Sequence, residues 1–326
     1  MSDAKFDVVC LGILVADVVV SGIDGLPPPA TICPVAGLSL GLGGCAANTA
    51  VCLARLGLRV AVVGKLGDDP LGRFVLDALK VERVNVEGVR VASGTATGAA
   101  VACIYPGGER GFWSLLGANG EMRPEDVDLE LIGAAKVLHV AGSPFLKGFN
   151  GVPCAKLMRL ARSQGVLTSL DTIHYGVGFR DLVEPEMRET DLLLPSHDEA
   201  RALSEEHTPA AMAAQLLRHG ARAVAIKMGG AGAYVADGRH SAMVPGIKTA
   251  VVDTVGAGDA FVAGFLAGWL QERSLAGCAQ WGNVLGAQCV AAPGATAGVR
   301  GREALLAQAA AAYGDAGFDD FCGSKK

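Results

Sequence analysis

The sequence predicts an α/β fold in which helices cover both faces of a mainly parallel central sheet. Strand-like apolar runs alternate with helix-like segments along most of the 326 residues, and this alternation is typical of βαβ units. Two regions, residues 14–40 and 89–117, instead resemble short strands joined by turns. We therefore expect one domain over residues 1–313, with a small β-sheet that is built from those two regions and projects from the core, and a flexible tail over residues 314–326.

The expected elements follow from periodicity and from turn residues. Apolar runs predict strands at Phe6–Ile13, Val60–Gly64, Lys136–Val140, Val166–Asp171, Leu192–Leu194, Ala223–Lys227 and Ala233–Ala236. Amphipathic or apolar segments predict helices at Ala46–Leu56, Pro70–Leu79, Glu125–Gly133, Pro153–Ser163, Asp198–Leu203, Pro209–His219, Gly258–Gln271, Leu275–Ala291 and Arg302–Tyr313. The apolar stretch that begins in the first strand contains Asp17 and follows no basic segment, so we interpret it as a buried strand and not as a signal peptide.

Composition restricts the class of function. Hydrophobic residues make up 51% of the chain and glycines number 45, which suits a compact α/β protein. The net charge of −5 gives no support for nucleic acid or an anionic membrane as a partner. Nine cysteines occur without a Cys-x-x-Cys pair or histidines at metal-ligand spacing. This pattern favours reduced thiols and a cytoplasmic protein.

The most informative segment is DTVGAGD, residues 253–259, which runs directly into the apolar AFVAGFLAGWL. Gly256, Ala257 and Gly258 have small side chains or none, so their N–H groups can approach an anion at a helix N-terminus, where the helix dipole adds positive charge. Asp259 stands in the first helical turn. An acid beside an anion cradle suits phosphoryl transfer, in which positioning and electrostatics carry most of the catalysis. A tight connection with a helix-stabilising acid is the structural alternative.

A second glycine-rich segment starts at Gly41. Gly43 and Gly44 let the backbone approach a ligand, and Asn48 follows within the next helical turn, where its amide could bind a hydroxyl or serve only a structural role. The segment also loosely fits the dinucleotide fingerprint Gly-x-Gly-x-x-Ala, with Asp68 about twenty residues further on. An NAD-dependent dehydrogenase is therefore a more distant alternative, although it leaves DTVGAGD unexplained.

Two further positions offer polar groups to a ligand. Asp17 lies near the carboxyl end of the first strand, where ligands gather in parallel sheets, and its carboxylate could accept two hydroxyl hydrogen bonds or be a buried, paired acid. Lys227, Gly229 and Gly232 lie between two predicted strands, in a simple hairpin turn or in a loop that contacts a nucleotide. The sequence contains no Walker-type Gly-x-x-x-x-Gly-Lys-Ser/Thr motif.

Together these segments resemble the ribokinase-like (PfkB) carbohydrate kinase family from about residue 6 to residue 312. DTVGAGDAFVAGFL resembles the C-terminal signature of the family, and GGCAANTAVCLARLG resembles its N-terminal Gly-Gly signature. The resemblance implies a ribokinase-like fold with a β-sheet lid over the substrate and, as in several relatives, a homodimer formed through the lid. It also implies ATP-dependent phosphorylation of a hydroxyl of a sugar or sugar-like small molecule, with ATP and Mg²⁺ as cofactors and K⁺ in some members.

The resemblance assigns a role to each matching residue. Asp259 is the expected general base, and the amides of Gly256, Ala257 and Gly258 are the expected anion hole. The other expected contacts divide between sugar and ATP: Asp17, Gly43, Gly44 and Asn48 for the sugar, and Lys227, Gly229, Gly232 and Asn283 for ATP. Glu199 is expected at Mg²⁺, directly or through water. Asp253 is expected to help hold a monovalent cation.

Three departures from the family pattern bear on these roles. Ser196 stands where many relatives have the Asn of Asn-x-x-Glu, which puts tuning by phosphate or excess metal in doubt. Lys227 replaces a common Thr, and its ammonium either meets a phosphate or caps the strand end. Asp171-Thr-Ile-His174 lacks Asp-x-Asn-x-Arg, which puts fructose and ketodeoxygluconate in doubt as substrates.

The alternative within the family is a nucleoside kinase. Phe112 and Trp113 lie in the predicted lid and could stack on a base. Packing or dimer contacts are the structural explanation for the same two aromatic residues.

Overall fold

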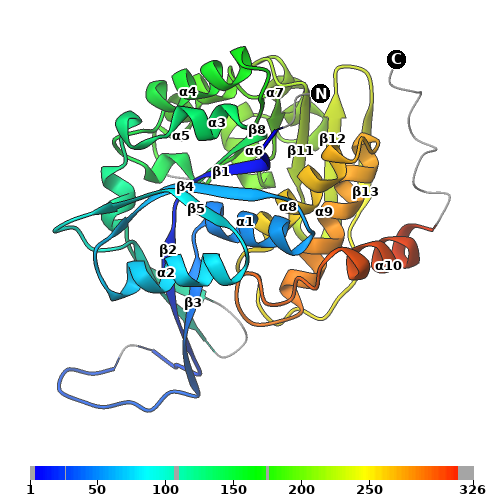
Figure 1. The fold of residues 1–326 in the computed structure, drawn as a ribbon. Coiled ribbons are helices and arrows are strands. Elements are labelled where there is room, and N and C mark those ends of the chain that lie inside the picture. Colours follow the sequence, from blue (N-terminus) through cyan, green and yellow to red (C-terminus); the bar gives the residue numbers. More distant parts are fainter. Residues whose placement is uncertain (1–3, 26, 106–109, 174–175, 315–326) are drawn as a thin grey trace.

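The computed structural model describes residues 4–25, 27–105, 110–173 and 176–314. These residues form a nine-stranded sheet with helices on both faces and a separate four-stranded sheet. Figure 1 shows the four-stranded sheet extending away from the body of the molecule. The predicted α/β architecture with a smaller second sheet is confirmed. Beyond Gly314, the tail predicted over residues 314–326 lies outside the described residues.

The large sheet has the order β13-β12-β11-β10-β9-β8-β1-β4-β5. Its strands are parallel from β11 to β5, and β12 and β13 add an antiparallel edge. The bounds are Phe6–Gly12 (β1), Val60–Gly67 (β4), Asn85–Ala92 (β5), Ala135–Ala141 (β8), Leu167–Asp171 (β9), Leu192–Leu193 (β10), Ala223–Lys227 (β11), Gly232–Asp237 (β12) and Ser241–Pro245 (β13).

Helices cover the two faces of this sheet in separate groups (Figure 1). One face carries α1 (Cys45–Arg55), α2 (Pro70–Val81), α8 (Ala257–Leu270), α9 (Leu275–Val290) and α10 (Arg302–Tyr313). The other carries α3 (Leu129–Gly133), α4 (Val152–Ser163), α5 (Phe179–Met187), α6 (His197–Ser204) and α7 (Pro209–Leu217). No helix in the described part of the chain is long and apolar enough to cross a membrane.

The central strand β1 explains why both faces are apolar. Val8 and Cys10 belong to the core under α1 and α8, whereas Val9 and Leu11 belong to the core on the opposite face. Successive side chains of a strand point to opposite faces, so a strand buried on both faces must be a continuous apolar run. This is why FDVVCLG could be assigned as a strand from the sequence alone.

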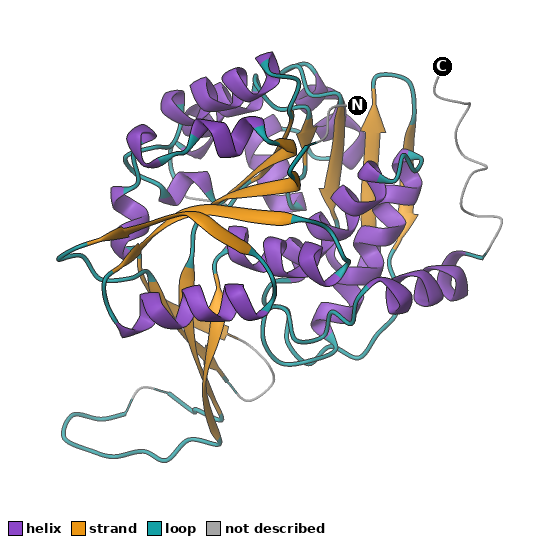
Figure 2. Cartoon of the chain, viewed as in Figure 1, coloured by secondary structure: helices purple, strands orange, loops and turns teal. Residues whose placement is uncertain are grey.

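The small sheet has the order β3-β2-β6-β7, and Figure 2 shows its strands projecting from the edge of the body. Its strands are Val15–Ser21 (β2), Gly37–Gly43 (β3), Ala99–Ile104 (β6) and Arg110–Leu115 (β7). The predicted second lid region, residues 89–117, needs a correction at its start, because residues 89–92 belong to β5. That strand pairs in parallel with β4 of the large sheet.

Three elements differ from the expectations. The single helix expected at Glu125–Gly133 is a 3₁₀ turn at Pro124–Asp126 and a separate helix α3, because the Asp128 side chain accepts hydrogen bonds from the first amides of α3. Helix α5, which contains Pro185, was not expected. Strand β13 was not expected either, and it pairs with β12 as an antiparallel hairpin.

Candidate active site

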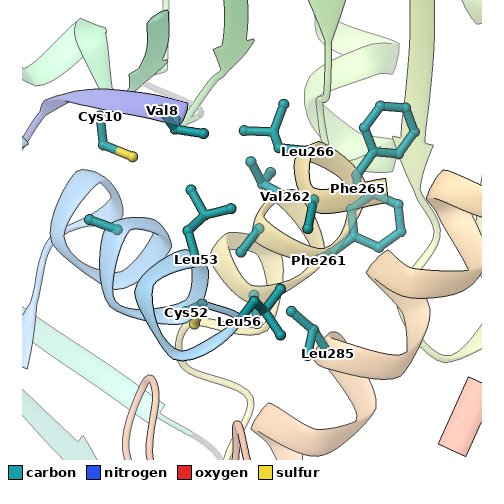
Figure 3. Packing of buried hydrophobic residues seen from close by; sticks show 14 of the residues in the cluster. Val8, Cys10, Cys52, Leu53, Leu56, Phe261, Val262, Phe265, Leu266 and Leu285 are labelled. Carbon is teal, nitrogen blue, oxygen red and sulfur yellow. The ribbon is translucent and has the colours of Figure 1, made fainter. Parts of the chain in front are cut away.

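Helices α1 and α8 pack side by side beneath β1 and carry four of the predicted site residues, Asn48 on α1 and Ala257, Gly258 and Asp259 on α8. Figure 3 shows Leu53 of α1, and Leu56 just beyond the end of that helix, on the side that faces Phe261, Val262 and Leu266 of α8. This apolar contact fixes the two helix N-termini next to each other. As a result Asn48, in the first turns of α1, meets Asp259, in the first turn of α8.

Asp259 is buried, with 7% of its surface exposed. Its Oδ2 accepts a 2.8 Å hydrogen bond from Nδ2 of Asn48, and the Cys45 thiol donates to the same carboxylate. Burial raises the pKa of Asp259 to about 6, although the hydrogen bond from Asn48 and the charge of Lys227 act in the opposite direction. A carboxylate with a pKa near 6 is ionised at neutral pH and can accept a proton from a hydroxyl.

Asn48 keeps one polar atom without a partner. Its Oδ1 is buried and makes no hydrogen bond within the described residues. A buried acceptor of this kind is costly unless a ligand donates to it. The atom therefore marks a place beside Asp259 where a hydroxyl can bind.

The turn before α8 contains the residues of the predicted anion cradle. Gly256 has φ +75°, and a Cβ there would lie 2.3 Å from the carbonyl oxygen of Ala295, so only glycine fits. Gly256 is also the N-cap residue and supplies no side-chain cap. Around this turn the Ala257 amide donates a 3.4 Å bond to Thr254, and no bond from the amides of Gly256 or Gly258 is present among the described residues. Amides without a partner at a helix N-terminus are available to bind an anion.

Asp17 and Gly43 are directly adjacent on the small sheet. A Cβ on Gly43 would lie 2.1 Å from Oδ2 of Asp17, so the carboxylate packs against the bare glycine backbone. Burial, followed by the charge of Asp259, raises the pKa of Asp17 to about 6. Gly44 has φ +90° and caps α1, which turns the chain from β3 toward Asn48. The four predicted sugar contacts are thus brought to one region.

A pocket of about 460 Å³ borders the 256–258 turn. It contains all four predicted ATP contacts together with two cradle residues: Lys227, Gly229, Gly232, Asn283, Ala257 and Gly258. Nδ2 of Asn283 donates hydrogen bonds to the carbonyls of Val244 and Pro245 and to the hydroxyl of Tyr313. Asn283 therefore shapes the wall of the pocket by holding β13.

Lys227 lies between this pocket and the cradle. Its Nζ forms an ion pair with Oδ1 of Asp171 at 2.5 Å. It would also lie 3.5 Å from a Cβ placed on Gly258. Burial acts to lower the pKa of Lys227, but the surrounding carboxylates, with Asp171 foremost, raise it above its ordinary value. The ammonium is therefore a permanent positive charge beside the cradle.

Glu199 and Ser196 form the capping box of α6. The Glu199 amide donates to Oγ of Ser196 at 3.3 Å, and Oε2 of Glu199 accepts from the Ser196 amide at 2.7 Å. Thr172 donates to the same oxygen at 3.3 Å. Ser196 thus serves as the N-cap of α6. The remaining oxygen, Oε1, takes no part in these bonds.

Asp253 ties the cradle to a neighbouring loop. Its Oδ1 accepts from the Val255 amide and its Oδ2 from the Gly294 amide, each at 2.9 Å. The Cys289 thiol contacts the carbonyls of Val255 and Ala295 in the same place. These bonds hold the 253–258 segment against residues 294–295.

The segment that fits the dinucleotide fingerprint does not follow a strand of the parallel sheet. Gly41 and Gly43 lie on β3, which pairs antiparallel with β2 in the small sheet, whereas the fingerprint follows a strand of a parallel sheet. The side chain of Asp68 is 66% exposed and pairs with Arg73 at 3.7 Å. We therefore drop the dehydrogenase alternative.

Two residues of the site escaped sequence reasoning. Cys45 precedes Asn48 by one helical turn and contacts the same carboxylate. Asp171 ends β9, and its position at the carboxyl end of a strand was a usable signal, the same one that singled out Asp17. Of the Asp171-Thr-Ile-His174 segment, His174 lies outside the described residues.

Residues 5–300 match the family described as pfkB family carbohydrate kinase, and the chain belongs to that family. The chain is 32% identical over 291 residues to the 2-dehydro-3-deoxygluconokinase of Bacillus subtilis strain 168, covering 83% of this chain and 87% of that one. It is 31% identical over 277 residues to the ATP-dependent ribose-1-phosphate kinase of Halopiger xanaduensis, covering 85% and 88%.

Solved ribokinase structures share the fold. A ribokinase from Arabidopsis thaliana, complexed with ribose and ATP, has a TM-score of 0.80 at 25% identity and covers 94% of this chain and 99% of its own. A putative ribokinase II from E. coli, in complex with ATP and Mg²⁺, has a TM-score of 0.83 at 24% identity and covers 93% and 98%. The predicted family, the ribokinase-like fold and the carbohydrate kinase class are confirmed.

Proposed function

We propose that this protein is an ATP-dependent phosphotransferase that phosphorylates a hydroxyl of a sugar or sugar-like small molecule. The observation that carries the proposal is the place of Asp259. Its carboxylate is buried against Asn48, while Gly258, the residue before it, lines the 460 Å³ pocket. A base and a nucleotide pocket therefore meet at one anion cradle.

The reaction follows from this arrangement. The acceptor hydroxyl loses its proton to the Asp259 carboxylate as its oxygen forms a bond to the γ-phosphorus of ATP. The bond between that phosphorus and the bridging oxygen breaks, and ADP leaves with the electron pair. The amides at residues 256–258 stabilise the charge on the transferring phosphoryl group. Asp17 and the Oδ1 of Asn48 orient the acceptor by hydrogen bonds to its other hydroxyls.

ATP would occupy the pocket between the 229–232 turn and α9, with Lys227, Gly229 and Gly232 toward the phosphates. Two relatives support ATP as the phosphoryl donor: the Arabidopsis ribokinase is complexed with ATP, and the Halopiger enzyme is an ATP-dependent kinase. The apolar side chains of Val251, Phe261, Ala287 and Val290 line the same pocket and suit an adenine ring.

Mg²⁺ would be held mainly by the phosphates. No cluster of three or more acidic, histidine or cysteine ligands occurs among the described residues, and Mg²⁺ commonly uses one or two carboxylates, substrate phosphates and water. Oε1 of Glu199 fits that role, directly or through water. When bound, the ion neutralises charge on the β- and γ-phosphates.

Asp253 is proposed to contribute to a monovalent cation site, with the carbonyls of the loop that it joins. Both of its oxygens already accept backbone amides, and a carboxylate can accept further contacts. The test is a comparison of turnover in KCl and in choline chloride at equal ionic strength. Equal rates in the two salts would reject the site.

The two aromatic residues of the lid, Phe112 and Trp113, lie on opposite faces of the small sheet. Phe112 pairs with Ala102, which pairs with Val19, so Phe112 shares a face with Asp17. Trp113 aligns with Val101 and lies on the opposite face. The expectation that both residues could stack on a substrate base is therefore retained only for Phe112. Its position favours a nucleoside as the second candidate acceptor.

The outer face of the small sheet supports a homodimer through the lid. Leu38, Leu40, Trp113 and Leu115 share that face by register and are each between 43% and 70% exposed. We propose that a second copy of the chain covers it. We also propose a cytoplasmic location, in keeping with the free thiols of the eight described cysteines.

The proposal is tested by ATP consumption over a panel of sugars, sugar acids, phosphosugars and nucleosides, with Asp259→Asn measured in parallel. We expect at least one acceptor to stimulate ADP formation, and the variant to lose about 10²–10³-fold in kcat. Phosphorylation of uridine or adenosine ahead of ribose would select the nucleoside alternative. Wild-type and variant rates that are equal on every acceptor would reject Asp259 as the base.

A further inference from the structure

One ion pair links the nucleotide pocket to the cradle and comes from two separate strands. Lys227 ends β11 and Asp171 ends β9, and β10 lies between them in the sheet. The backbone at Lys227 is held by a 2.9 Å hydrogen bond to the carbonyl of Pro195. The backbone end of the lysine side chain is thus fixed, and the ion pair with Asp171 determines where the ammonium lies.

Both members of the pair are shielded from solvent. The side chains of Lys227 and Asp171 are 12% and 6% exposed. Separating a shielded pair leaves an uncompensated charge, which is strongly unfavourable. Asp171 therefore keeps Lys227 as its partner when a nucleotide binds. An ammonium has three N–H donors, so the lysine can donate to Asp171 and to a phosphoryl oxygen together.

The surroundings of Lys227 make this anchoring necessary. Asp171, Glu199 and Asp259 all act electrostatically on the lysine. An ammonium on a flexible stem could move toward any of these carboxylates, and toward Asp259 it would block the base. Pairing with Asp171 leaves the ammonium next to Gly258, at the cradle, where the phosphoryl group adds negative charge.

We propose that Asp171 is a positioning residue that holds the ammonium of Lys227 at the cradle, where Lys227 contacts the transferring phosphoryl group while it remains paired. This rests on the proposed phosphotransferase function and adds a residue to it. Asp171 acts through Lys227 and touches neither substrate.

A double-mutant cycle tests the pair. We expect Lys227→Met to lower kcat by about 10²–10³-fold, the scale of a lost transition-state donor, and Asp171→Asn to lower kcat by about tenfold because the lysine is less well placed. In the Lys227→Met background, Asp171→Asn should change kcat by less than about twofold. An equal loss from Asp171→Asn in both backgrounds would show that Asp171 acts independently, and would overturn the proposal.

Lys227→Gln is a second variant, chosen in case Lys227→Met does not fold. The side-chain amide of glutamine can still donate a hydrogen bond to Asp171, but it carries no charge. This variant should lose as much kcat as Lys227→Met, and an unchanged kcat would overturn the proposal. The matched control is the Lys65–Asp126 pair, at 2.9 Å with 14% and 20% exposure, which lies outside the pocket. Lys65→Met and Asp126→Asn should leave kcat unchanged.

Nucleotide binding separates this inference from the proposed function. Thermal shifts with Mg-ATP and with adenosine should show that Lys227→Gln weakens stabilisation by ATP but not by adenosine. Equal weakening of both would overturn the contact with phosphate. If the wild type phosphorylates no acceptor in the panel, the proposed function fails, while the comparison of ATP with adenosine still decides the role of Lys227.

Discussion

The Nδ2 of Asn48 donates a 2.8 Å hydrogen bond to Oδ2 of Asp259 and so joins the first turns of two helices that are 211 residues apart in sequence. The bond favours the ionised carboxylate, and it acts against burial, which raises the pKa of Asp259 to about 6. The strength of the proposed base at neutral pH is therefore set partly by one amide.

This relationship predicts the acid limb of the pH–rate profile. The proposed base is inactive when protonated, so kcat/KM, which reports the groups of the free enzyme, should fall tenfold per pH unit below about pH 6. Asn48→Leu removes a bond to the charged form and should move the acid limb upward by about one pH unit. The control is Asn150→Leu, whose amide donates to the carbonyl of Pro144. An acid limb that stays in place in Asn48→Leu would contradict the assignment.

The contact between Asp17 and Gly43 predicts a selective loss of acceptor affinity. Gly43→Ala would place a Cβ 2.1 Å from Oδ2 of Asp17 and displace the carboxylate. We expect KM for the acceptor to rise by about tenfold or more, with KM for ATP unchanged, because a misplaced carboxylate loses its hydrogen bonds to the acceptor. Gly41→Ala is the matched control, since the nearest atom to its Cβ is 3.9 Å away. The prediction fails if both variants raise KM equally.

Local sequence patterns were sufficient for parts of the site that lie at a helix start. Gly256 and Asp259 form the turn and first helical residues of α8, and Gly44 and Asn48 do the same for α1, so each half could be assigned from one segment. The strands of the parallel sheet were equally accessible because burial on both faces requires continuous apolar runs.

Features that depend on pairing between distant segments could not be predicted in this way. The Asp171–Lys227 pair depends on the order of β9, β10 and β11 in the sheet. Residues 89–92 have a strand pattern that suits either sheet, and only pairing with β4 assigns them to the large one. The separation of Phe112 from Trp113 depends on the register between β6 and β7.

The hydrogen bonds that Asp253 accepts predict that the 253–258 segment changes conformation when one carboxylate oxygen is removed. Asp253→Asn offers one oxygen where two amides, those of Val255 and Gly294, now donate. We expect kcat to fall by about tenfold or more with little change in KM for the acceptor, because the proposed anion hole is made of backbone from this loop. Asp237→Asn is the control, since Asp237 accepts the amides of Arg239 and His240 in a distant hairpin. A similar loss of kcat in both variants would contradict the prediction.

The two faces of the small sheet predict different effects for its neighbouring aromatic residues. Trp113 lies on the outer apolar face and is 54% exposed, so Trp113→Ser should weaken the proposed dimer. Phe112 is 55% exposed on the face shared with Asp17, and Phe112→Ser should leave the dimer intact but alter acceptor preference. Light scattering coupled to size-exclusion chromatography measures the mass. A wild type that is monomeric at all concentrations would reject the dimer.

The buried carboxyl of Glu186 predicts how stability changes with pH. Glu186 has no exposed surface, and it accepts hydrogen bonds from the Ser143 hydroxyl and the Gly151 amide at 2.5 and 2.7 Å. Burial raises its pKa from 4.5 to about 7 in spite of these bonds.

Because the folded pKa is the higher one, the native state binds the proton more tightly, and the contribution of Glu186 to stability falls as pH rises from about 4.5 to about 7. Glu186→Gln keeps the shape of the side chain and removes the titration. Relative to wild type, the variant should gain up to about 3 kcal/mol in free energy of unfolding between pH 4.5 and pH 8. His139 also makes stability depend on pH. Burial lowers its pKa to about 3, so its contribution to the free energy of unfolding rises with pH below pH 6.5. This contribution is the same in wild type and variant, and it cancels when the two free energies of unfolding are subtracted. Urea unfolding at several pH values measures the free energy of unfolding of both proteins. If the difference between variant and wild type does not vary with pH, Glu186 is ionised in the native protein throughout, and the prediction is wrong.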